Sequence, residues 1–272
     1  MIGVEIRRQA KRRRTLYSYL ALVAIPVVVM TALLTNGGPG DDRRQGRGGG
    51  GDLVDVASSS GLNFALFMLL ATSQFLLVVV VALFAGDAVA SEGQWGSLRY
   101  LLTRPIPRFR LLRTKLVVAT LYAVAAVLTV PVAALAMGSI AFGWSRVQTP
   151  LAGALGVNTG LSRLALGTGY VVACMAVVIA LAFLFSTMTD APLSAVGGAV
   201  VLIVVSEILD QVTAMGSLRN ALPTHYWLAW LDLLVDPVDA THMTTGLLEM
   251  LPWVAVPLAL AFWNFRRKDV LS

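Results

Sequence analysis

The stretch GDAVASEGQWGSLRYLLTRPIPRFRLLRTK, residues 86–115, is the only long polar passage that lies between two membrane-spanning runs of the chain. Its first half, Asp87 to Leu102, carries apolar residues at helical intervals and is predicted to form a helix. Pro105 and Pro107 lack a backbone N–H and restrict the residue before them, so residues 103–107 are predicted to form an extended elbow. The remainder alternates Phe and Leu with Arg and Lys, which is typical of a basic amphipathic segment at a membrane surface. These features predict a polar structure that another protein could bind.

The chain around this stretch is far too apolar for a soluble domain. Its 272 residues are 57% hydrophobic and 13% charged, and the mean hydropathy is +0.76. A helix of about 20 apolar residues spans the hydrocarbon core and satisfies its own backbone hydrogen bonds there. Windows of this kind occur at residues 16–35, 62–85, 116–144, 164–186, 191–212 and 245–265. We therefore predict an all-α integral membrane protein with six transmembrane helices in a single domain over residues 1–272.

The first apolar run has a rival interpretation as a cleaved signal peptide. The run is longer than a typical signal core, and no small-residue cleavage pattern closes it. Five further spans also follow. We therefore predict a retained first helix.

The basic residues predict the orientation of the six helices. Residues 1–15, residues 86–115 and the tail at 266–268 carry six, six and three of the 21 Lys and Arg residues. Six spans place these three segments on one side of the membrane, and the positive-inside rule makes that side the cytoplasm. Both termini are thus predicted to be cytoplasmic, in the plasma membrane. The net charge of +6 is explained by this orientation, and nucleic acid is not predicted as a partner.

This topology divides the polar parts of the chain into segments. They are a basic cytoplasmic interfacial segment at 1–15, a flexible outer loop at 36–60, the cytoplasmic loop at 86–115 and an outer loop at 213–244. Residues 1–14 are predicted to form a short helix on the anionic cytoplasmic leaflet. Within the last loop, residues 222–236 are predicted to form a helix in the outer interface, because their apolar residues recur at helical intervals and Trp is common at headgroup level.

Several site classes are not predicted. The glycine-rich run 36–52 lacks the Lys-Ser/Thr pair and the flanking strand and helix of a phosphate-binding loop. The two histidines, His225 and His242, lie 17 residues apart without neighbouring cysteines, so no metal site is predicted. The single cysteine, Cys174, excludes an intrachain disulfide.

Polar residues inside the predicted spans are the remaining candidates for function. Asn63, Thr72, Ser73 and Gln74 lie in the second span, and Glu207 lies near the outer end of the fifth. Polar groups at such depth must face protein or water. Two interpretations stay open for the second span, interhelical hydrogen bonding or a role in substrate passage. For Glu207 the alternatives are a functional carboxylate or an interfacial partner of Arg219.

The 86–115 stretch resembles the cytoplasmic loop of the type-2 ATP-binding-cassette (ABC) exporter permeases. The resemblance rests on Gly86-Asp87, Glu92, Gly96-Ser97-Leu98-Arg99, Leu101-Leu102, Arg104-Pro105, Arg108, Leu111-Leu112 and Lys115. Residues 222–227 and 265–270 also look similar to segments of these permeases. The glycine- and arginine-rich loop at 36–52 departs from the family pattern.

The resemblance implies a function for the chain. The chain would be a transport subunit rather than an enzyme, with no cofactor of its own, and ATP and Mg²⁺ would bind to a separate cytosolic ATPase partner. A coupling helix would dock on that ATPase through Glu92, Trp95, Gly96, Ser97, Arg99 and Leu102. A second copy or a paralogue would complete the permease, and substrate would pass between second and fifth spans through Asn63, Thr72, Ser73, Gln74 and Glu207.

Three other functions stay open as alternatives. A secondary transporter needs intramembrane charges and usually an inverted repeat, and the sequence offers only Glu207 and no repeat. A membrane enzyme needs a cluster of His, Asp or Ser on one face, which is not evident. A non-transporting sensor or assembly subunit that works with an ATPase has the same sequence features.

Overall fold

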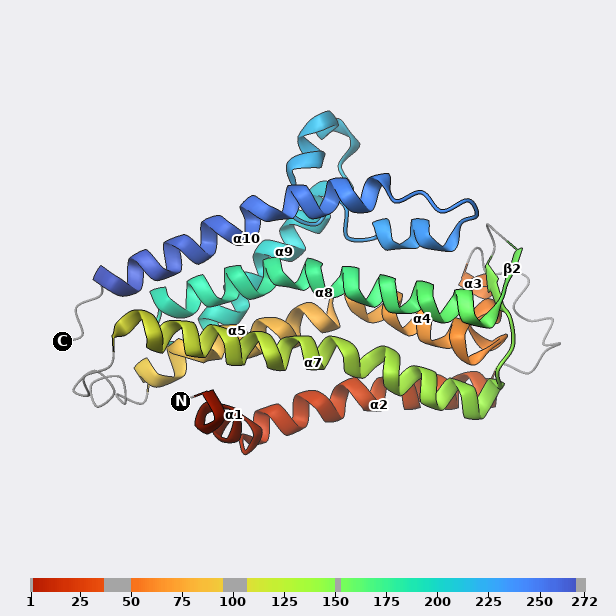
Figure 1. Cartoon of the computed structure of the whole chain (residues 1–272), viewed down its shortest axis with the longest axis horizontal. Coiled ribbons are helices and arrows are strands. Elements are labelled where there is room, and N and C mark those ends of the chain that lie inside the picture. Colours follow the sequence, from red (N-terminus) through yellow and green to blue (C-terminus); the bar gives the residue numbers. More distant parts are fainter. Residues whose placement is uncertain (1, 37–49, 95–106, 150–152, 268–272) are drawn as a thin grey trace.

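The computed structural model describes residues 2–36, 50–94, 107–149 and 153–267 of the chain. In these parts the chain is almost entirely helical (Figure 1). The α-helices are α1 (Ile2–Ala10), α2 (Arg13–Asn36), α3 (Gly50–Ser58), α4 (Gly61–Ser73), α5 (Leu76–Gln94), α7 (Arg108–Phe142), α8 (Val157–Met188), α9 (Pro192–Asp210) and α10 (Thr241–Arg267). Two 3₁₀ helices, η2 (Thr213–Ala221) and η3 (Ala229–Leu234), lie between α9 and α10.

Six of the described helices are long and apolar enough to cross a membrane, which confirms a multi-pass membrane protein. They are α2, α5, α7, α8, α9 and α10. Each predicted span corresponds to one of them, except that the second span consists of α4 and α5 in succession. The protein is thus an all-α membrane protein, as predicted.

Two side-chain hydrogen bonds lie next to the break between α4 and α5. The Thr72 hydroxyl donates to the carbonyl of Met68 at 2.7 Å, and the Ser73 hydroxyl donates to the carbonyl of Leu70 at 3.1 Å. Such bonds compete with the helical backbone bonds and bend helices. The helix ends at Ser73 and resumes at Leu76.

Two elements were not predicted from the sequence. Residues 50–58 of the predicted outer loop form α3, whereas residues 37–49 lie outside the described parts. A hairpin of β1 (Val147–Thr149) and β2 (Gly153–Leu155) precedes α8, with Val147 paired to Leu155 in antiparallel register. Elements this short do not contain enough residues to show the hydrophobic periodicity from which a span is recognised.

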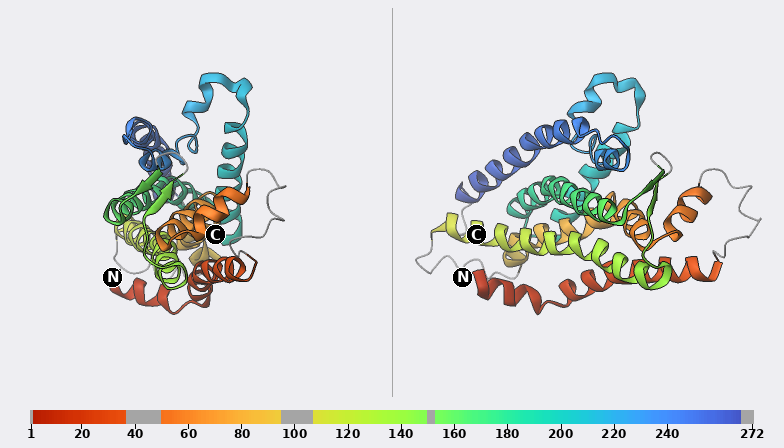
Figure 2. Two further views of the ribbon diagram at one scale, coloured as in Figure 1. Left: turned by 90° about the vertical axis from the view of Figure 1, so that its right-hand side faces the viewer. Right: turned by 45° about the vertical axis from the view of Figure 1, so that its right-hand side comes forward.

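The long helices lie roughly side by side along the longest axis of the molecule (Figure 1). α2 runs along one side of the bundle and α10 along the opposite side (Figure 2). α1, the end of α5, the start of α7 and the end of α10 gather at one end of the molecule, and α3 with the hairpin lies at the other (Figure 1). We call the first of these the terminal end.

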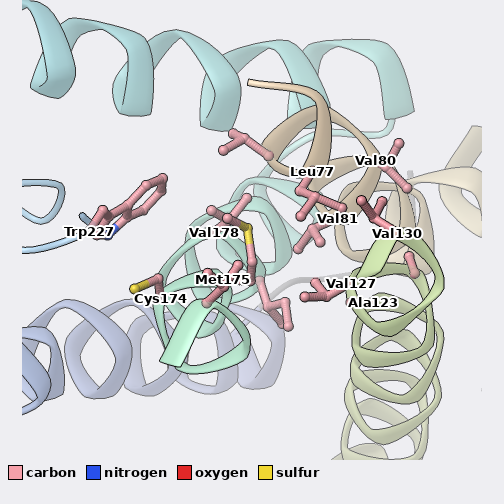
Figure 3. Packing of buried hydrophobic residues seen from close by; sticks show 14 of the residues in the cluster. Leu77, Val80, Val81, Ala123, Val127, Val130, Cys174, Met175, Val178 and Trp227 are labelled. Atoms are coloured by element: carbon pink, nitrogen blue, oxygen red, sulfur yellow. The ribbon is translucent and has the colours of Figure 1, made fainter. Parts of the chain in front are cut away.

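The core of the bundle forms where α5 packs against α7, α8 and α9. Fully buried side chains from three helices meet there, among them Leu77 and Val81 of α5, Val127 of α7, and Met175 and Val178 of α8 (Figure 3). These apolar side chains fill the space between the three helices, and van der Waals packing of this kind holds helices together in a bilayer. α5 and α8 are therefore the central helices, while α2, α9 and α10 lie at the periphery.

Glycine makes one of the helix contacts possible. A Cβ atom at Gly61 of α4 would lie 2.6 Å from the backbone nitrogen of Ser139 and 2.7 Å from the carbonyl carbon of Gly138, both in α7. The backbone N–H of Gly61 also donates to the carbonyl of Gly143 at 3.0 Å. Only a residue without a side chain fits at position 61.

Candidate functional site

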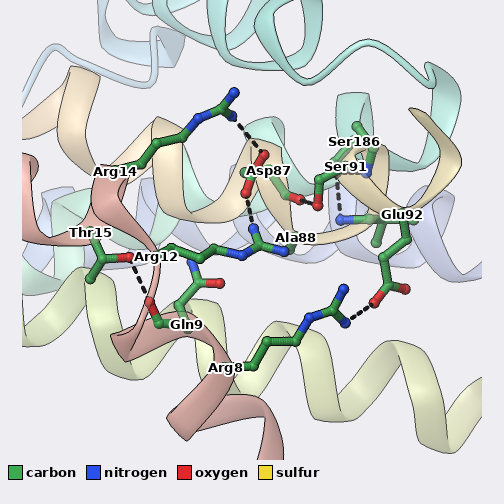
Figure 4. Close-up of polar contacts among 12 residues, drawn as sticks. Arg8, Gln9, Arg12, Arg14, Thr15, Asp87, Ala88, Ser91, Glu92 and Ser186 are labelled. Atoms are coloured by element: carbon green, nitrogen blue, oxygen red, sulfur yellow. Dashed lines mark hydrogen bonds and ion pairs between the residues drawn. The ribbon is translucent and has the colours of Figure 1, made fainter. Parts of the chain in front are cut away.

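Charged side chains from four helices meet at the terminal end of the bundle. We call this group the terminal cluster. It consists of Glu5, Arg8, Arg12, Arg14, Asp87, Glu92 and Lys115. Figure 4 shows the arginines at positions 8, 12 and 14 beside Asp87 and Glu92. The two acids of α5 and Lys115 of α7 are all buried. Ions at such positions are costly unless they are paired and hydrogen bonded, so the cluster is a specific arrangement.

One half of the cluster surrounds Asp87. Arg12 contacts Oδ2 of Asp87, and Nη1 of Arg14 lies 3.3 Å from Oδ1. The Asp87 side chain is only 5% exposed, whereas that of Arg14 is 66% exposed. The start of α2 is thereby attached to the middle of α5.

The other half surrounds Glu92. Oε1 of Glu92 lies 2.7 Å from Nζ of Lys115 and 3.0 Å from Nη1 of Arg8. Nζ of Lys115 also donates to the carbonyl of Ala88 at 2.9 Å and lies 3.6 Å from Glu5. Because charge-assisted hydrogen bonds are about twice as strong as neutral ones, this pair links the end of α5 firmly to the start of α7.

α5 is also attached to α8 at this level. The buried hydroxyl of Ser186 accepts hydrogen bonds from the backbone N–H groups of Val89 and Ala90, at 3.0 and 2.9 Å. The Ser91 hydroxyl donates to the carbonyl of Asp87 at 2.6 Å. The segment of α5 that carries both acids is therefore held from two sides.

The N-terminal segment is bound to the bundle rather than only to the leaflet. α1 is helical, as the sequence predicted, but the Tyr122 hydroxyl donates to the carbonyl of Ile6 at 2.7 Å. The arginines at positions 8, 12 and 14 contact carboxylates of α5. Two localised acids within reach are stronger partners than a diffuse lipid charge. α1 therefore contacts the bundle, and its predicted position on the leaflet stays a prediction.

The structure describes only part of the predicted docking set. Glu92 is 2% exposed and lies in the terminal cluster, so its side chain offers no surface contact. Trp95, Gly96, Ser97, Arg99 and Leu102 lie outside the described residues. Asp87 to Gln94 continue the second span as the last turns of α5, and the predicted basic segment forms the first turns of α7. Pro107, in an extended conformation, precedes α7.

The predicted substrate-path residues of the second span are not brought together in a cavity. Thr72 and Ser73 are buried and bond to their own helix, whereas Gln74 is exposed at the break. Asn63 is buried at the opposite end of α4, where its amide contacts the carbonyls of Val56 and Gln148 at 2.9 and 3.0 Å. For these three buried residues the interhelical or local hydrogen-bonding interpretation fits better.

Glu207 lies on α9 and is partly buried. Its Oε1 atom is shielded from solvent, and within the described parts of the chain it has no hydrogen-bond partner. Arg219 does not pair with it, because Nε of Arg219 lies 3.4 Å from Asp210, which His225 also contacts. Within the described residues Glu207 and Arg219 do not form an ion pair, while the position of Glu207 near the interface stays a prediction.

Accessibility to a thiol reagent distinguishes these positions. On a Cys174→Ala background, we expect Gln74→Cys to react with N-ethylmaleimide in the folded protein, and Thr72→Cys and Ser73→Cys to react only after denaturation. The reason is the burial of residues 72 and 73 and the exposure of residue 74. Mass spectrometry of the intact protein measures the adduct. Equal labelling of all three positions would show that α4 does not pack in this way.

The outer segment 222–236 differs from the predicted α-helix. It consists of turns and η3, and Trp227 and Trp230 are 5% and 1% exposed, so both rings pack inside the protein. The ring of Trp230 packs on α8 where a Cβ at Gly167 would approach it to 2.9 Å. The Nε1 groups of both tryptophans are buried and have no hydrogen-bond partner within the described parts of the chain.

The start of α10 is held by Asp239. Hydrogen bonds from the Thr241 hydroxyl and backbone N–H lower the pKa of Asp239, and the N–H of Thr241 lies 2.9 Å from Oδ1. The carboxylate thus stays ionised beside the positive end of the helix. His242 contacts Asp232 at 2.8 Å, so each of the two histidines has a carboxylate partner.

The comparisons with known proteins give a family without an assigned activity. A family model described as "Protein of unknown function (DUF2705)" matches residues 52–271. No curated protein matches the chain. The matched region contains α5 and α7. It therefore includes Asp87, Glu92 and Lys115 of the terminal cluster.

Proposed function

We propose that this chain, which belongs to the DUF2705 family of unknown function, is the membrane-spanning subunit of an ATP-binding-cassette exporter. It forms the substrate path and couples to a separate cytosolic ATPase that binds ATP and Mg²⁺. The proposal rests on the resemblance of residues 86–115 to the coupling loop of type-2 exporter permeases. One observation carries it further, namely the buried pair that Glu92 and Lys115 form.

The pair explains how a movement of the loop can be transmitted to the helices of the bundle. Glu92 and Lys115 flank the loop on either side, and their charged atoms lie 2.7 Å apart. A partner that moves the residues between them therefore moves α5 and α7 together, since the base of the loop is closed. Arg8 extends the connection to α1, and Ser186 extends it to α8. In this proposal Glu92 positions the loop, and residues 95–102 make the direct contacts with the ATPase.

The remaining features of the proposal follow from charge and exposure. The terminal end carries the basic segments, so the positive-inside rule assigns it to the cytoplasm of the plasma membrane. α9 presents Leu193, Val201, Val205 and Ile208 as an exposed apolar face. This face meets lipid or a second copy or paralogue of the permease, as a two-fold assembly requires. Gln74 and Glu207 stay as candidates for the substrate path, because they are not fully buried.

The first test is to find the partner. The tagged chain is purified from its native membrane in mild detergent, and co-purifying proteins are identified by mass spectrometry. We expect a cytosolic protein with phosphate-binding-loop motifs whose ATPase activity depends on the permease. A chain that purifies without an ATPase but drives ion-coupled flux in vesicles would instead be a secondary transporter. An active ATPase complex without any flux would indicate a sensor or assembly subunit.

The second test concerns coupling. Deletion of Gln94–Ser97 should lower the permease-dependent part of the ATPase activity by about 10-fold or more, because coupling free energies of 1–3 kcal/mol correspond to about 5–150-fold. Glu92→Gln should also lower the permease-dependent ATPase activity, while the complex still assembles. Glu249→Gln, an exposed glutamate of α10, is the control. Unchanged ATPase activity in both loop variants would contradict the proposal.

A further inference from the structure

A groove separates α1 from the first turns of α7 at the terminal end. Its volume is about 940 Å³, and its walls include Ile2, Phe109, Arg110, Arg113, Thr114 and Val117. The volume lies in the range of pockets that hold small ligands. The groove is open on one side and combines apolar surface with two guanidinium groups, so its chemistry suits an amphipathic molecule with an anionic end.

The two arginines of the groove differ from the cations of the terminal cluster. Arg8, Arg12, Arg14 and Lys115 each contact a carboxylate. Arg110 and Arg113 are exposed, and neither forms an ion pair within the described parts of the chain. The adjoining residues 95–106, whose placement is not described, contain no Asp or Glu. Within the described parts of the chain, two positive charges one helical turn apart therefore have no carboxylate partner.

The face of α7 that carries these arginines continues as an apolar stripe. Thr114, Val117, Leu121 and Leu128 follow Arg110 at intervals that place them on one side of the helix. Leu121 and Leu128 are 51% and 45% exposed. The charged part of the stripe is therefore followed directly by an exposed apolar part. A lipid has the same order, with a charged headgroup followed by an apolar acyl chain.

The length of α7 is compatible with a charged start at headgroup level and an apolar stripe within the hydrocarbon core. Its 35 residues extend over about 52 Å at 1.5 Å per residue, whereas the hydrocarbon core is about 30 Å thick. The helix is therefore long enough for its charged first turns to lie at headgroup level while the apolar stripe from Val117 onward lies along the acyl chains. Basic residues at this level attract anionic lipids.

We propose that the groove between α1 and α7 is a binding site for an anionic phospholipid. Arg110 and Arg113 bind the phosphate of the headgroup, while Ile2, Phe109 and Val117 contact the upper part of an acyl chain. Guanidinium groups suit phosphate because they donate several hydrogen bonds in one plane. The site would anchor α1 to the start of α7 through the lipid. The proposal does not depend on the transport function, since it uses only the groove and its charges.

Lipid retention tests the proposal. The full-length chain in detergent is mixed with dioleoylphosphatidylglycerol or dioleoylphosphatidylcholine, and bound lipid is counted by native mass spectrometry. We expect the anionic lipid to bind more tightly than the zwitterionic one. The double variant R110Q/R113Q should weaken binding of the anionic lipid about 30-fold, because each basic residue near an anionic lipid surface contributes about fivefold. The charge-retaining variant R110K/R113K should bind within a few-fold of the wild type.

The matched control is K11Q/R13Q, which removes two exposed cations at the same end of the bundle but outside the groove. It should retain the lipid. Equal loss in both double variants would show that only net charge matters and would overturn the proposal. Release of the lipid by millimolar inorganic phosphate alone would show that the groove binds free phosphate rather than a lipid, and would contradict the proposal. An efficient disulfide between Thr114→Cys and Tyr100→Cys in the Cys174→Ala protein, with no lipid retained, would make residues 95–106 the occupant.

Discussion

Lys115→Met is expected to lower the free energy of unfolding by about 3–5 kcal/mol, which is the usual cost of removing one partner of a buried ion pair. Lys115 is 5% exposed, and its ammonium is the closest partner of Glu92 at 2.7 Å. The substitution keeps the apolar stem of the side chain but removes the charge. Arg8 remains near the carboxylate, but its own side chain is 48% exposed. Unfolding in mixed dodecyl maltoside and sodium dodecyl sulfate micelles measures the loss.

A double-mutant cycle separates the ion pair from packing. Glu92→Gln combined with Lys115→Met should be less destabilising than the sum of the two single changes, because no unpaired buried charge remains. Lys11→Met is the control, since Lys11 is exposed, and it should change stability by no more than about 0.5 kcal/mol. Strictly additive effects of the two single variants would show that Glu92 and Lys115 do not interact.

Gly61→Val is expected to destabilise the protein by about 3 kcal/mol, and Gly61→Ala by about 1–2 kcal/mol, as overpacking in a well-packed contact does. Even the Cβ of alanine would lie 2.6 Å from the backbone of Ser139. The obstacle is main chain, so it cannot rotate away as a side chain could. α4 and α7 must therefore separate, and the break after Ser73 leaves α4 with only 13 residues to hold its position.

The control for this prediction is another glycine within a helix. A Cβ at Gly197 of α9 would have no atom within 4 Å. Gly197→Ala should therefore not destabilise the protein, because alanine is also the better helix former. The same unfolding measurement applies to both positions. If Gly61→Ala were as well tolerated as Gly197→Ala, the close contact between α4 and α7 would be wrong.

Much of the architecture was predictable because the bilayer leaves few choices. A run of about 20 apolar residues in lipid must satisfy its backbone hydrogen bonds within itself, so each run becomes a helix whatever its neighbours are. The number of spans and their approximate positions therefore follow from hydropathy. The gathering of the basic segments at one end also follows, since an even number of spans returns the chain to the side on which it began.

The terminal cluster could be predicted only in part. Two acids that follow an apolar run, Asp87 and Glu92, lie on the same predicted side as the basic N-terminal segment. Ion pairs between these acids and that segment could have been predicted from this, but were not. Glu92 was singled out, but as a surface contact. Asp87 and Lys115 were named only as part of the resemblance, and no role was assigned to them or to Arg12, because the choice of partner depends on how α1, α5 and α7 approach one another.

The sequence by itself determined that this protein spans a membrane with six helices and where its charges concentrate, because these properties depend on each segment alone. The tertiary structure decided which charges meet, that Trp227 and Trp230 are buried beside α8, and that Thr72 and Ser73 bond to their own helix. It also separated the paired cations of the terminal cluster from Arg110 and Arg113 in the groove. Such outcomes depend on distances of a few ångströms between segments far apart in the chain, and hydropathy and periodicity carry no information about those distances.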